Sequence, residues 1–169
     1  EPQPASEFAG LYAQAQRHVV AGETAKALVL YDSLLQQVGA LAVTAEAVGA
    51  AEAALRLTAD YAKQRIQFGR PIGTFQAVKH PLAEAYVDTQ SFQSLVYYAA
   101  WCVDQGHRDL PLAISRAKAY ASEALPKLGI DAIQLHGGIG FTWEYDAHLY
   151  LKRAKWLRPA FGDADWHYE

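Results

Sequence analysis

Two glycine-rich stretches of the sequence carry side chains that could hold an anionic ligand. Residues 64–76 contain two arginines, two phenylalanines and two glycines, and residues 134–141 contain three glycines that follow a histidine. An arginine guanidinium pairs with phosphate oxygens, and glycine leaves backbone N–H groups open to close approach. The combination suits a phosphate or a pyrophosphate. The pattern alone fits helix-capping glycines and solvated arginines as well, so both interpretations stay open at this point.

The other residue types that commonly do chemistry have no supporting spacing. The six histidines are widely separated and lack the short spacings of metal ligands, so no metal site is predicted. No Gly-x-Ser-x-Gly stretch supports a serine hydrolase. His136 is expected to be a hydrogen-bonded loop residue rather than a general base. Cys102 lies in an apolar run, which predicts a buried, unreactive thiol, and Tyr97, Tyr98 and Trp101 around it are expected to pack in the core.

Length and composition limit the class of protein. The chain has 169 residues, a hydrophobic fraction of 51% and a net charge of −3. These values suit one domain with a substantial core and do not favour nucleic-acid binding. No uninterrupted apolar run reaches the roughly 18 residues of a membrane span, and no signal peptide opens the chain, so a cytoplasmic location is expected. The absence of any methionine indicates a processed product or one part of a larger protein.

Helical periodicity begins at Ser33. Apolar residues at three- and four-residue intervals predict a long helix from there to about Phe68 and Gly69, with Gly69 as its left-handed cap. Its many alanines keep it thin, so we expect it at the centre of a bundle. A second helix is predicted from Thr74, as the N-cap, to about Asp104.

Two more helices follow in the second half of the chain. The third is predicted from Asp109 to Ile133, with a kink or a break near Pro126. The fourth is predicted to open at Thr142 and to end at Pro159. Three long helices and one shorter helix with short connections predict an all-α, up-and-down four-helix bundle.

This topology places the two glycine-rich stretches at the same end of the bundle, because residues 64–76 follow the first helix and residues 134–141 follow the third. The bundle is expected to occupy residues 35–169. Residues 1–34 are expected to be a lead segment or the remnant of a β domain. Within them, the first ten residues are predicted to be flexible, and a short strand is slightly favoured at residues 27–31.

Both glycine-rich stretches, read in full, resemble the C-terminal helical domain of acyl-CoA dehydrogenases. The first block of resemblance is residues 65–84, and the second is residues 134–145 with the helix that follows to Lys155. The blocks occur in the family's order and at about its spacing. Complete chains of the family are more than twice as long and carry an N-terminal helical domain and a middle β domain before this bundle.

The resemblance implies FAD bound across a subunit interface, with homologous acyl-CoA dehydrogenase subunits as partners in a hetero- or homo-oligomer. In the family, an R-x-x-F-G motif and a Q-x-x-G-G motif contact the adenosine–pyrophosphate part of the neighbouring subunit's FAD. The positions that match these motifs here are Arg65, Phe68, Gln134 and Gly138. Gln76 and Gly137 are expected beside them as further cofactor-binding residues.

The family's reaction needs a glutamate that removes the α proton while the β hydrogen leaves as hydride to the flavin. In the commoner class this glutamate falls on Phe161, and in the other class it falls on Gly39. Glu46 is the nearest acid of the same helix, but seven residues place it about 10 Å further along. Asp163 and Asp165 stand where a threonine and a glutamine usually touch the chain's own flavin. The resemblance therefore implies no catalytic base.

These departures favour a catalytically silent subunit that completes the FAD site of a homologous partner, for dehydrogenation of an acyl-CoA thioester. Heteromeric members of the family act in actinobacterial steroid breakdown, so a bulky thioester is one expectation. Two alternatives stay open. One is an active enzyme in which Asp163, Asp165 or Glu46 acts as a relocated base. The other is a flavin-free helical module that only oligomerises.

Overall fold

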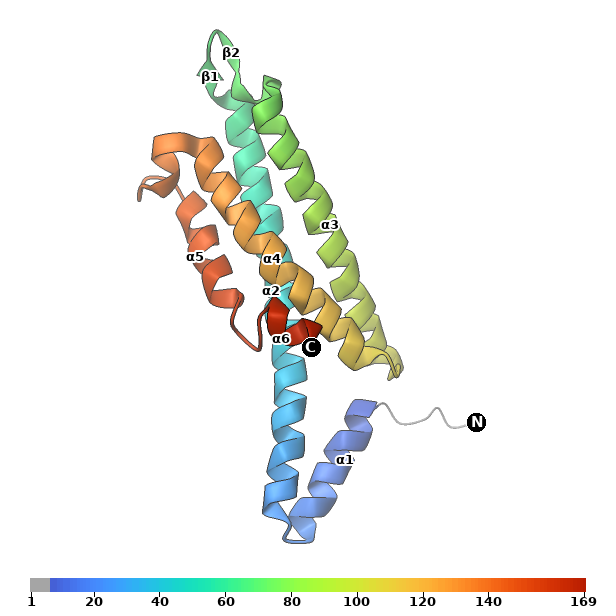
Figure 1. Cartoon of the computed structure of the whole chain (residues 1–169). Helices are drawn as coiled ribbons and strands as arrows, with labels where there is room; N and C mark the ends of the chain where they lie inside the picture. The colour runs from blue at the N-terminus through green and yellow to red at the C-terminus, as the bar shows by residue number, and fades with distance from the viewer. Residues whose placement is uncertain (1–6) are drawn as a thin grey trace.

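The computed structural model describes residues 7–169, and helices dominate that range (Figure 1). In chain order the elements are α1 (Glu7–Val20), α2 (Thr24–Gln64), β1 (Ile66–Gln67), β2 (Arg70–Pro71), the 3-10 turn η1 (Ile72–Thr74), α3 (Gln76–Gln105), α4 (Leu110–His136), the 3-10 turn η2 (Gly137–Phe141), α5 (Ala147–Leu157) and α6 (Ala164–Tyr168). Helices α2, α3, α4 and α5 form the bundle, which confirms the predicted all-α fold.

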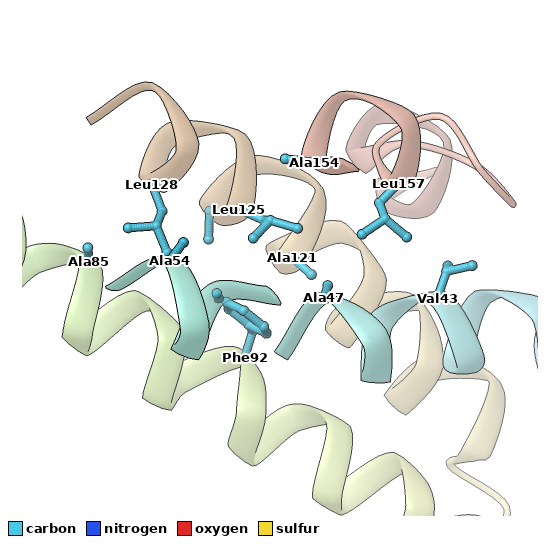
Figure 2. Packing of buried hydrophobic residues seen from close by; sticks show 12 residues of the cluster. Val43, Ala47, Ala54, Ala85, Phe92, Ala121, Leu125, Leu128, Ala154 and Leu157 are labelled. Atoms are coloured by element: carbon cyan, nitrogen blue, oxygen red, sulfur yellow. The ribbon is translucent and has the colours of Figure 1, made fainter. Parts of the chain in front are cut away.

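Helix α2 is the element that the others pack around. Its 41 residues make it about 60 Å long, and it contacts α1, α3, α4 and α5. Six of its ten buried residues are alanines, which confirms the expectation of a thin central helix. Figure 2 shows the result: Phe92 of α3 lies between α2 and α4, and Leu125 and Leu157 reach in from α4 and α5. Close packing of small and large side chains gives the bundle its core.

The N-terminal part is helical, so the strand predicted at residues 27–31 is wrong. Helix α2 begins at Thr24, and α1 folds back along its first turns (Figure 1). Tyr12 of α1 meets Tyr31 of α2 edge to face, with ring centroids 6.0 Å apart, and Ala27 is buried. Alanine and leucine are strong helix formers, and a packing partner settled the ambiguity. The predicted flexible lead-in fails at residues 7–10, which are helical, and otherwise lies outside the described residues.

Two predicted helix signals have other roles. Gly69 does not cap α2, which ends five residues earlier at Gln64. Thr74 is not the N-cap of α3: that position belongs to Phe75, and the Thr74 hydroxyl donates to the Pro71 carbonyl oxygen at 2.7 Å. Gly69 lies in the turn of the β1–β2 hairpin, and Thr74 lies in η1, where its hydroxyl bonds to the main chain instead of capping α3.

The second half of the chain needs two similar corrections. Pro126 does not break α4, which continues to His136. Packing of that stretch against α2, α3 and α5 outweighs the loss of one backbone hydrogen bond. Helix α5 begins at Ala147 rather than at Thr142, because η2 and a turn intervene; the Thr142 hydroxyl donates to the Ile139 carbonyl oxygen at 2.9 Å.

The end of α3 carries aromatic side chains on its surface. Tyr97, Tyr98 and Trp101 are 66%, 40% and 47% exposed, so the prediction that they pack in the core is wrong. Tyr98 and Trp101 stack on each other, with centroids 5.9 Å apart. Cys102 on the same helix is fully buried and free, as predicted.

By length and composition, α2 could cross a membrane, and 28% of its most apolar window is buried in the structure. The prediction from uninterrupted apolar runs missed this helix, because scattered polar residues divide it. The same apolar character serves a bundle helix that packs against four neighbouring helices, so this feature is weak evidence for a membrane span.

Candidate functional site

The chain leaves α2 through a two-stranded hairpin. Ile66 pairs with Pro71 and Gln67 pairs with Arg70. Phe68 and Gly69 form the turn with φ angles of 54° and 75°, the left-handed values of a type I′ hairpin. A phenylalanine in this region of φ is unusual, and such strain occurs preferentially at functional sites. The Phe68 side chain is 92% exposed, so the turn presents an aromatic ring to whatever binds there.

Arg65 stands at the base of the hairpin with its backbone fixed. Its N–H donates to the Tyr61 carbonyl oxygen at 2.8 Å, and its carbonyl oxygen accepts from the Ile72 N–H at 2.8 Å. The side chain is exposed and forms no ion pair with any residue of the described range 7–169. Because the backbone is fixed and the guanidinium has no ion pair among the described residues to break, Arg65 can bind an anion without first losing an internal contact.

A second cation supports the turn. The Arg70 guanidinium carbon lies 4.2 Å from the centre of the Phe75 ring, and Phe75 meets Phe68 edge to face at 6.0 Å. Gln76, the first residue of α3, follows directly and is exposed. A Cβ atom added at Gly73 would lie 3.1 Å from the Ala62 carbonyl oxygen, so this glycine lets η1 lie against the end of α2.

The second loop begins at the last turn of α4. Gln134 is exposed there, and the exposed Gly137 and Gly138 start η2. Gly137 has a φ of 65°, which a side chain would strain, whereas Gly138 has no such constraint. A Cβ atom added at either glycine would meet no heavy atom within 4 Å. The Gly137 N–H already donates to the Gln134 and Ile133 carbonyl oxygens, so the two glycines offer a ligand space to approach the main chain.

A ring cluster joins the two loops. The Tyr61 hydroxyl of α2 donates to the His136 carbonyl oxygen at 3.3 Å. The Tyr61 and His136 rings lie 4.4 Å apart, and Tyr145 lies 5.8 and 4.7 Å from them. This contact confirms that both loops lie at one end of the bundle. Sequence reasoning missed the cluster, although each loop has one of these rings within four residues of its predicted ligand-binding positions.

His136 serves this cluster as a structural residue. It is 3% exposed, and its Nδ1 donates to the Ala132 carbonyl oxygen at 2.6 Å. Burial lowers the pKa of its imidazole, because the charged form loses hydration. The ring is tilted against both tyrosine rings. His136 is thus hydrogen-bonded, as expected, but it is the last residue of α4 rather than a loop residue.

A different picture holds at the middle of α2, where Gly39 faces the turn between α5 and α6. A Cβ atom added at Gly39 would overlap the Phe161 ring. Phe161 has a φ of 58° and packs against both buried clusters of the protein. The two residues are far apart in the sequence, yet the phenyl ring fills the space over the glycine. Neither the phenyl ring nor the glycine has an atom that can accept a proton.

The acids near this turn are engaged elsewhere or exposed. The Glu46 carboxylate binds the Arg153 guanidinium through two contacts, of which the Nη2–Oε2 pair measures 2.7 Å. Hydrogen bonding to Arg153 lowers the pKa of Glu46. Asp163 is the N-cap of α6, and its Oδ1 accepts from the Trp166 N–H at 3.2 Å. Asp165 is exposed. Among residues 7–169, no three His, Cys, Asp or Glu side chains gather as a metal site.

Sequence comparison gives a family match over most of the chain. The model of the acyl-CoA dehydrogenase C-terminal domain matches residues 35–169. The acyl-CoA dehydrogenase IpdE2 of Mycobacterium tuberculosis is 46% identical over 123 residues, which cover 73% of this chain and 37% of that protein. The chain thus spans little more than a third of the length of this relative.

Solved structures give the same match in three dimensions. The ChsE4–ChsE5 complex of Mycobacterium tuberculosis aligns with a TM-score of 0.76 and 32% identity, over 86% of this chain and 38% of that one. Butyryl-CoA dehydrogenase of Megasphaera elsdenii aligns with a TM-score of 0.75 and 32% identity, over 79% of this chain and 34% of that one.

Proposed function

The chain belongs to the acyl-CoA dehydrogenase family, and from that premise we propose that it completes the FAD site of a homologous partner subunit while supplying no base itself. The assembly would remove hydrogen from the α and β carbons of an acyl-CoA thioester. The ChsE4–ChsE5 structure, a complex of two different proteins, supports a partner of the same family.

One observation carries the proposal: the phenyl ring of Phe161 lies over Gly39. The family resemblance puts the reaction's glutamate at one or the other of these positions. Their contact supports the alignment, because two alternative positions for one base must face the same substrate atom. A hydrocarbon ring cannot take up a proton, and here it also occupies the space that a positioned carboxylate needs.

The loops at the other end fit the adenosine–pyrophosphate part of FAD. Arg65 offers an exposed guanidinium for the pyrophosphate, and Gly137 and Gly138 offer an open backbone. Phe68 offers an exposed ring for apolar or stacking contact, with Gln76 and Gln134 as flanking amides. Bound FAD supplies the acceptor for the hydride; the role of these residues is to hold and orient it.

The relocated-base alternative has weaker support. Glu46 is tied to Arg153, and a lowered pKa makes its carboxylate a poorer base. Asp163 would have to leave its position as the N-cap of α6 before it could reach a substrate. Asp165 has neither of these restrictions, so it is the acid that the alternative would have to use.

The test compares the chain alone with its complex with a full-length family member that keeps the glutamate. We expect flavin absorbance in the complex and none in the chain alone. Replacement of Arg65 by alanine removes a charge-assisted hydrogen bond worth roughly 1.5–3 kcal/mol, so FAD affinity of the complex should fall roughly 10- to 150-fold. Lys63→Ala is the matched control, because it removes an exposed cation two residues away that pairs with Asp60.

Three results would contradict the proposal in different ways. FAD binding and dehydrogenation by the chain alone would support a relocated base. If the partner bound the same amount of FAD with and without this chain, the result would support the flavin-free module. Equal FAD affinity in the Arg65→Ala and Lys63→Ala complexes would show that Arg65 has no role in pyrophosphate binding.

A further inference from the structure

A buried lysine lies beside the turn that carries Phe161. Lys118 of α4 is 2% exposed. Its Nζ donates to the Ser122 hydroxyl at 2.8 Å, to the Arg158 carbonyl oxygen at 2.9 Å and to the Gly162 carbonyl oxygen at 2.6 Å. An ammonium group has three donors, so all of them are used. Two of the three bonds reach the main chain of the α5–α6 turn.

The turn needs such support because its backbone is unusual. Phe161 and Gly162 have φ angles of 58° and 90°, and a phenylalanine in that region is strained. Within the turn, the Gly162 N–H donates to the Pro159 carbonyl oxygen at 3.2 Å. His167 of α6 adds a bond from its Nε2 to the Phe161 carbonyl oxygen at 3.0 Å. Side chains from α4 and α6 thus bind three carbonyl groups of the turn, those of Arg158, Phe161 and Gly162, and two of these bonds come from Lys118.

The bonds from Lys118 act on carbonyl groups and not on the side chain of residue 161. They fix where the main chain of the turn lies, and the phenyl ring over Gly39 is a consequence. The same main-chain position would be kept for another side chain at 161. Positioning through the backbone is how a rigid framework can present different groups at one place.

We propose that Lys118 is the positioning residue of the α5–α6 turn: its two main-chain hydrogen bonds hold residue 161 over Gly39. Lys118 thereby explains why the Phe161 ring covers Gly39, where the family's base would act. Only this catalytic consequence rests on the proposed function; the positioning itself does not. In this arrangement, the base is lost through the side chain at position 161, while the Lys118 hydrogen bonds that position residue 161 are kept.

The groups that face Lys118 agree with this role. Burial lowers the pKa of Lys118 to about 8, and the nearby Asp163 carboxylate opposes that shift. Burial also lowers the pKa of His167, and the Lys118 charge lowers it further. Near pH 7 the Lys118 ammonium is therefore charged and donates three hydrogen bonds, whereas the His167 imidazole is neutral and donates one, from Nε2. Ser122 is the remaining polar partner.

Hydrogen exchange of the chain alone tests the local part of the proposal. Lys118→Met keeps the length of the side chain and removes its donors. We expect amides of residues 158–168 to exchange at least roughly tenfold faster, with no change in α3. Ser122→Ala, which removes only the partner within α4, should leave the turn protected. Unchanged exchange in the turn would overturn the proposal, and so would an equal increase throughout the chain.

A second measurement separates positioning from general packing. In the natural chain, Gly39→Ala should lower the Tm by roughly 2–4 °C, because the added methyl group overlaps the Phe161 ring and this cost exceeds the gain in helix propensity. In a Lys118→Met background the ring is free to move, and this penalty should disappear. If Lys118→Met does not fold, Lys118→Gln, which keeps two donors, takes its place. An equal penalty in both backgrounds would refute the positioning role.

These experiments are independent of the cofactor. They use no flavin and no partner, so their failure would leave the Arg65 test intact. Conversely, if Arg65→Ala left the FAD affinity of the complex unchanged, the proposed function would be refuted, while the coupling between Lys118 and Gly39 would still be tested separately.

Discussion

The loop end of the bundle and the α5–α6 turn differ in what their strained residues expose. At the loop end, Phe68 has a left-handed backbone and is almost fully exposed, next to open glycines and to Arg65, which forms no ion pair within residues 7–169. At the turn, Phe161 has nearly the same φ but lies against the core over Gly39. The loop end, called here the open region, exposes its side chains to another molecule. The α5–α6 turn, called here the closed region, packs its side chain against the protein's own core. A subunit that binds a cofactor without turning over substrate would show this contrast.

The largest expected effect tests how firmly the closed region is held. The folded pKa of Lys118 is about 8, below its ordinary value of 10.5, so between these pH values the unfolded state binds more protons. The free energy of unfolding should therefore rise with pH across that window, by up to about 3 kcal/mol relative to Lys118→Met. Urea denaturation from pH 7 to pH 10.5 measures the difference.

The matched variant cancels the titration of the other lysines, because both proteins share them. A pH-independent difference between the two proteins would mean that Lys118 titrates normally and is solvated. The closed region would then be looser than its hydrogen bonds imply.

The next effect tests the contact between Gly39 and Phe161 directly. Gly39→Ala gains helix propensity of about 1 kcal/mol but overlaps the ring, at a cost of about 1–3 kcal/mol. Combined with Phe161→Ala, only the gain should remain, so a double-mutant cycle should give a coupling energy of about 2 kcal/mol. Thermal denaturation supplies the four values.

Gly49 provides the control for that cycle. It lies in the same helix, and a Cβ atom added there meets nothing within 4 Å. Gly49→Ala should stabilise the protein by about 0.5–1 kcal/mol with or without Phe161. Coupling of similar size at both glycines would show that the ring does not cover Gly39 specifically.

The open region is tested by filling it. Gly138→Leu adds a side chain to free space without backbone strain, so the Tm of the chain should stay unchanged. In the complex, the added side chain blocks approach to the backbone, and FAD affinity should fall by roughly tenfold, or about 1.4 kcal/mol. Titration of the complex with FAD measures this. Gly10→Leu, at another open glycine on α1, should change neither quantity; equal effects would mean that η2 lies outside the cofactor site.

Sequence reasoning found the elements that depend on local pattern. The periodicity of α2, α3 and α4 and the glycine-rich loops that follow α2 and α4 are set by residues close in the chain. The bundle and the shared end of the two loops could therefore be predicted. The strand at residues 27–31 and the cap at Gly69 could not be read correctly, because α1 and the Phe68–Gly69 hairpin decide them.

What sequence reasoning could not reach was contact between distant residues. Gly39 and Phe161 were each identified as positions that lack a base, but nothing in their spacing predicts that one covers the other. The hydrogen bonds from Lys118 to Arg158 and Gly162 join α4 to a turn 40 residues later, and no local pattern encodes them. Such contacts depend on how helices pack, which requires the three-dimensional structure.

The smallest expected effect decides whether Glu46 is more than a surface residue. Its pKa is lowered by Arg153, so the ion pair stabilises the fold above the ordinary pKa of a glutamate, and this contribution disappears as pH falls through the lowered value. Because both partners are exposed, Glu46→Gln should lower the Tm at pH 7 by less than roughly 3 °C. High salt should reduce that difference, and dehydrogenation by the complex should not change. Glu52→Gln is the control, since Glu52 accepts from the neutral Gln93 on α3. If Glu46→Gln alone abolished turnover, the acid would be the relocated base, and the contrast between an open cofactor end and a closed reaction position would have to be abandoned.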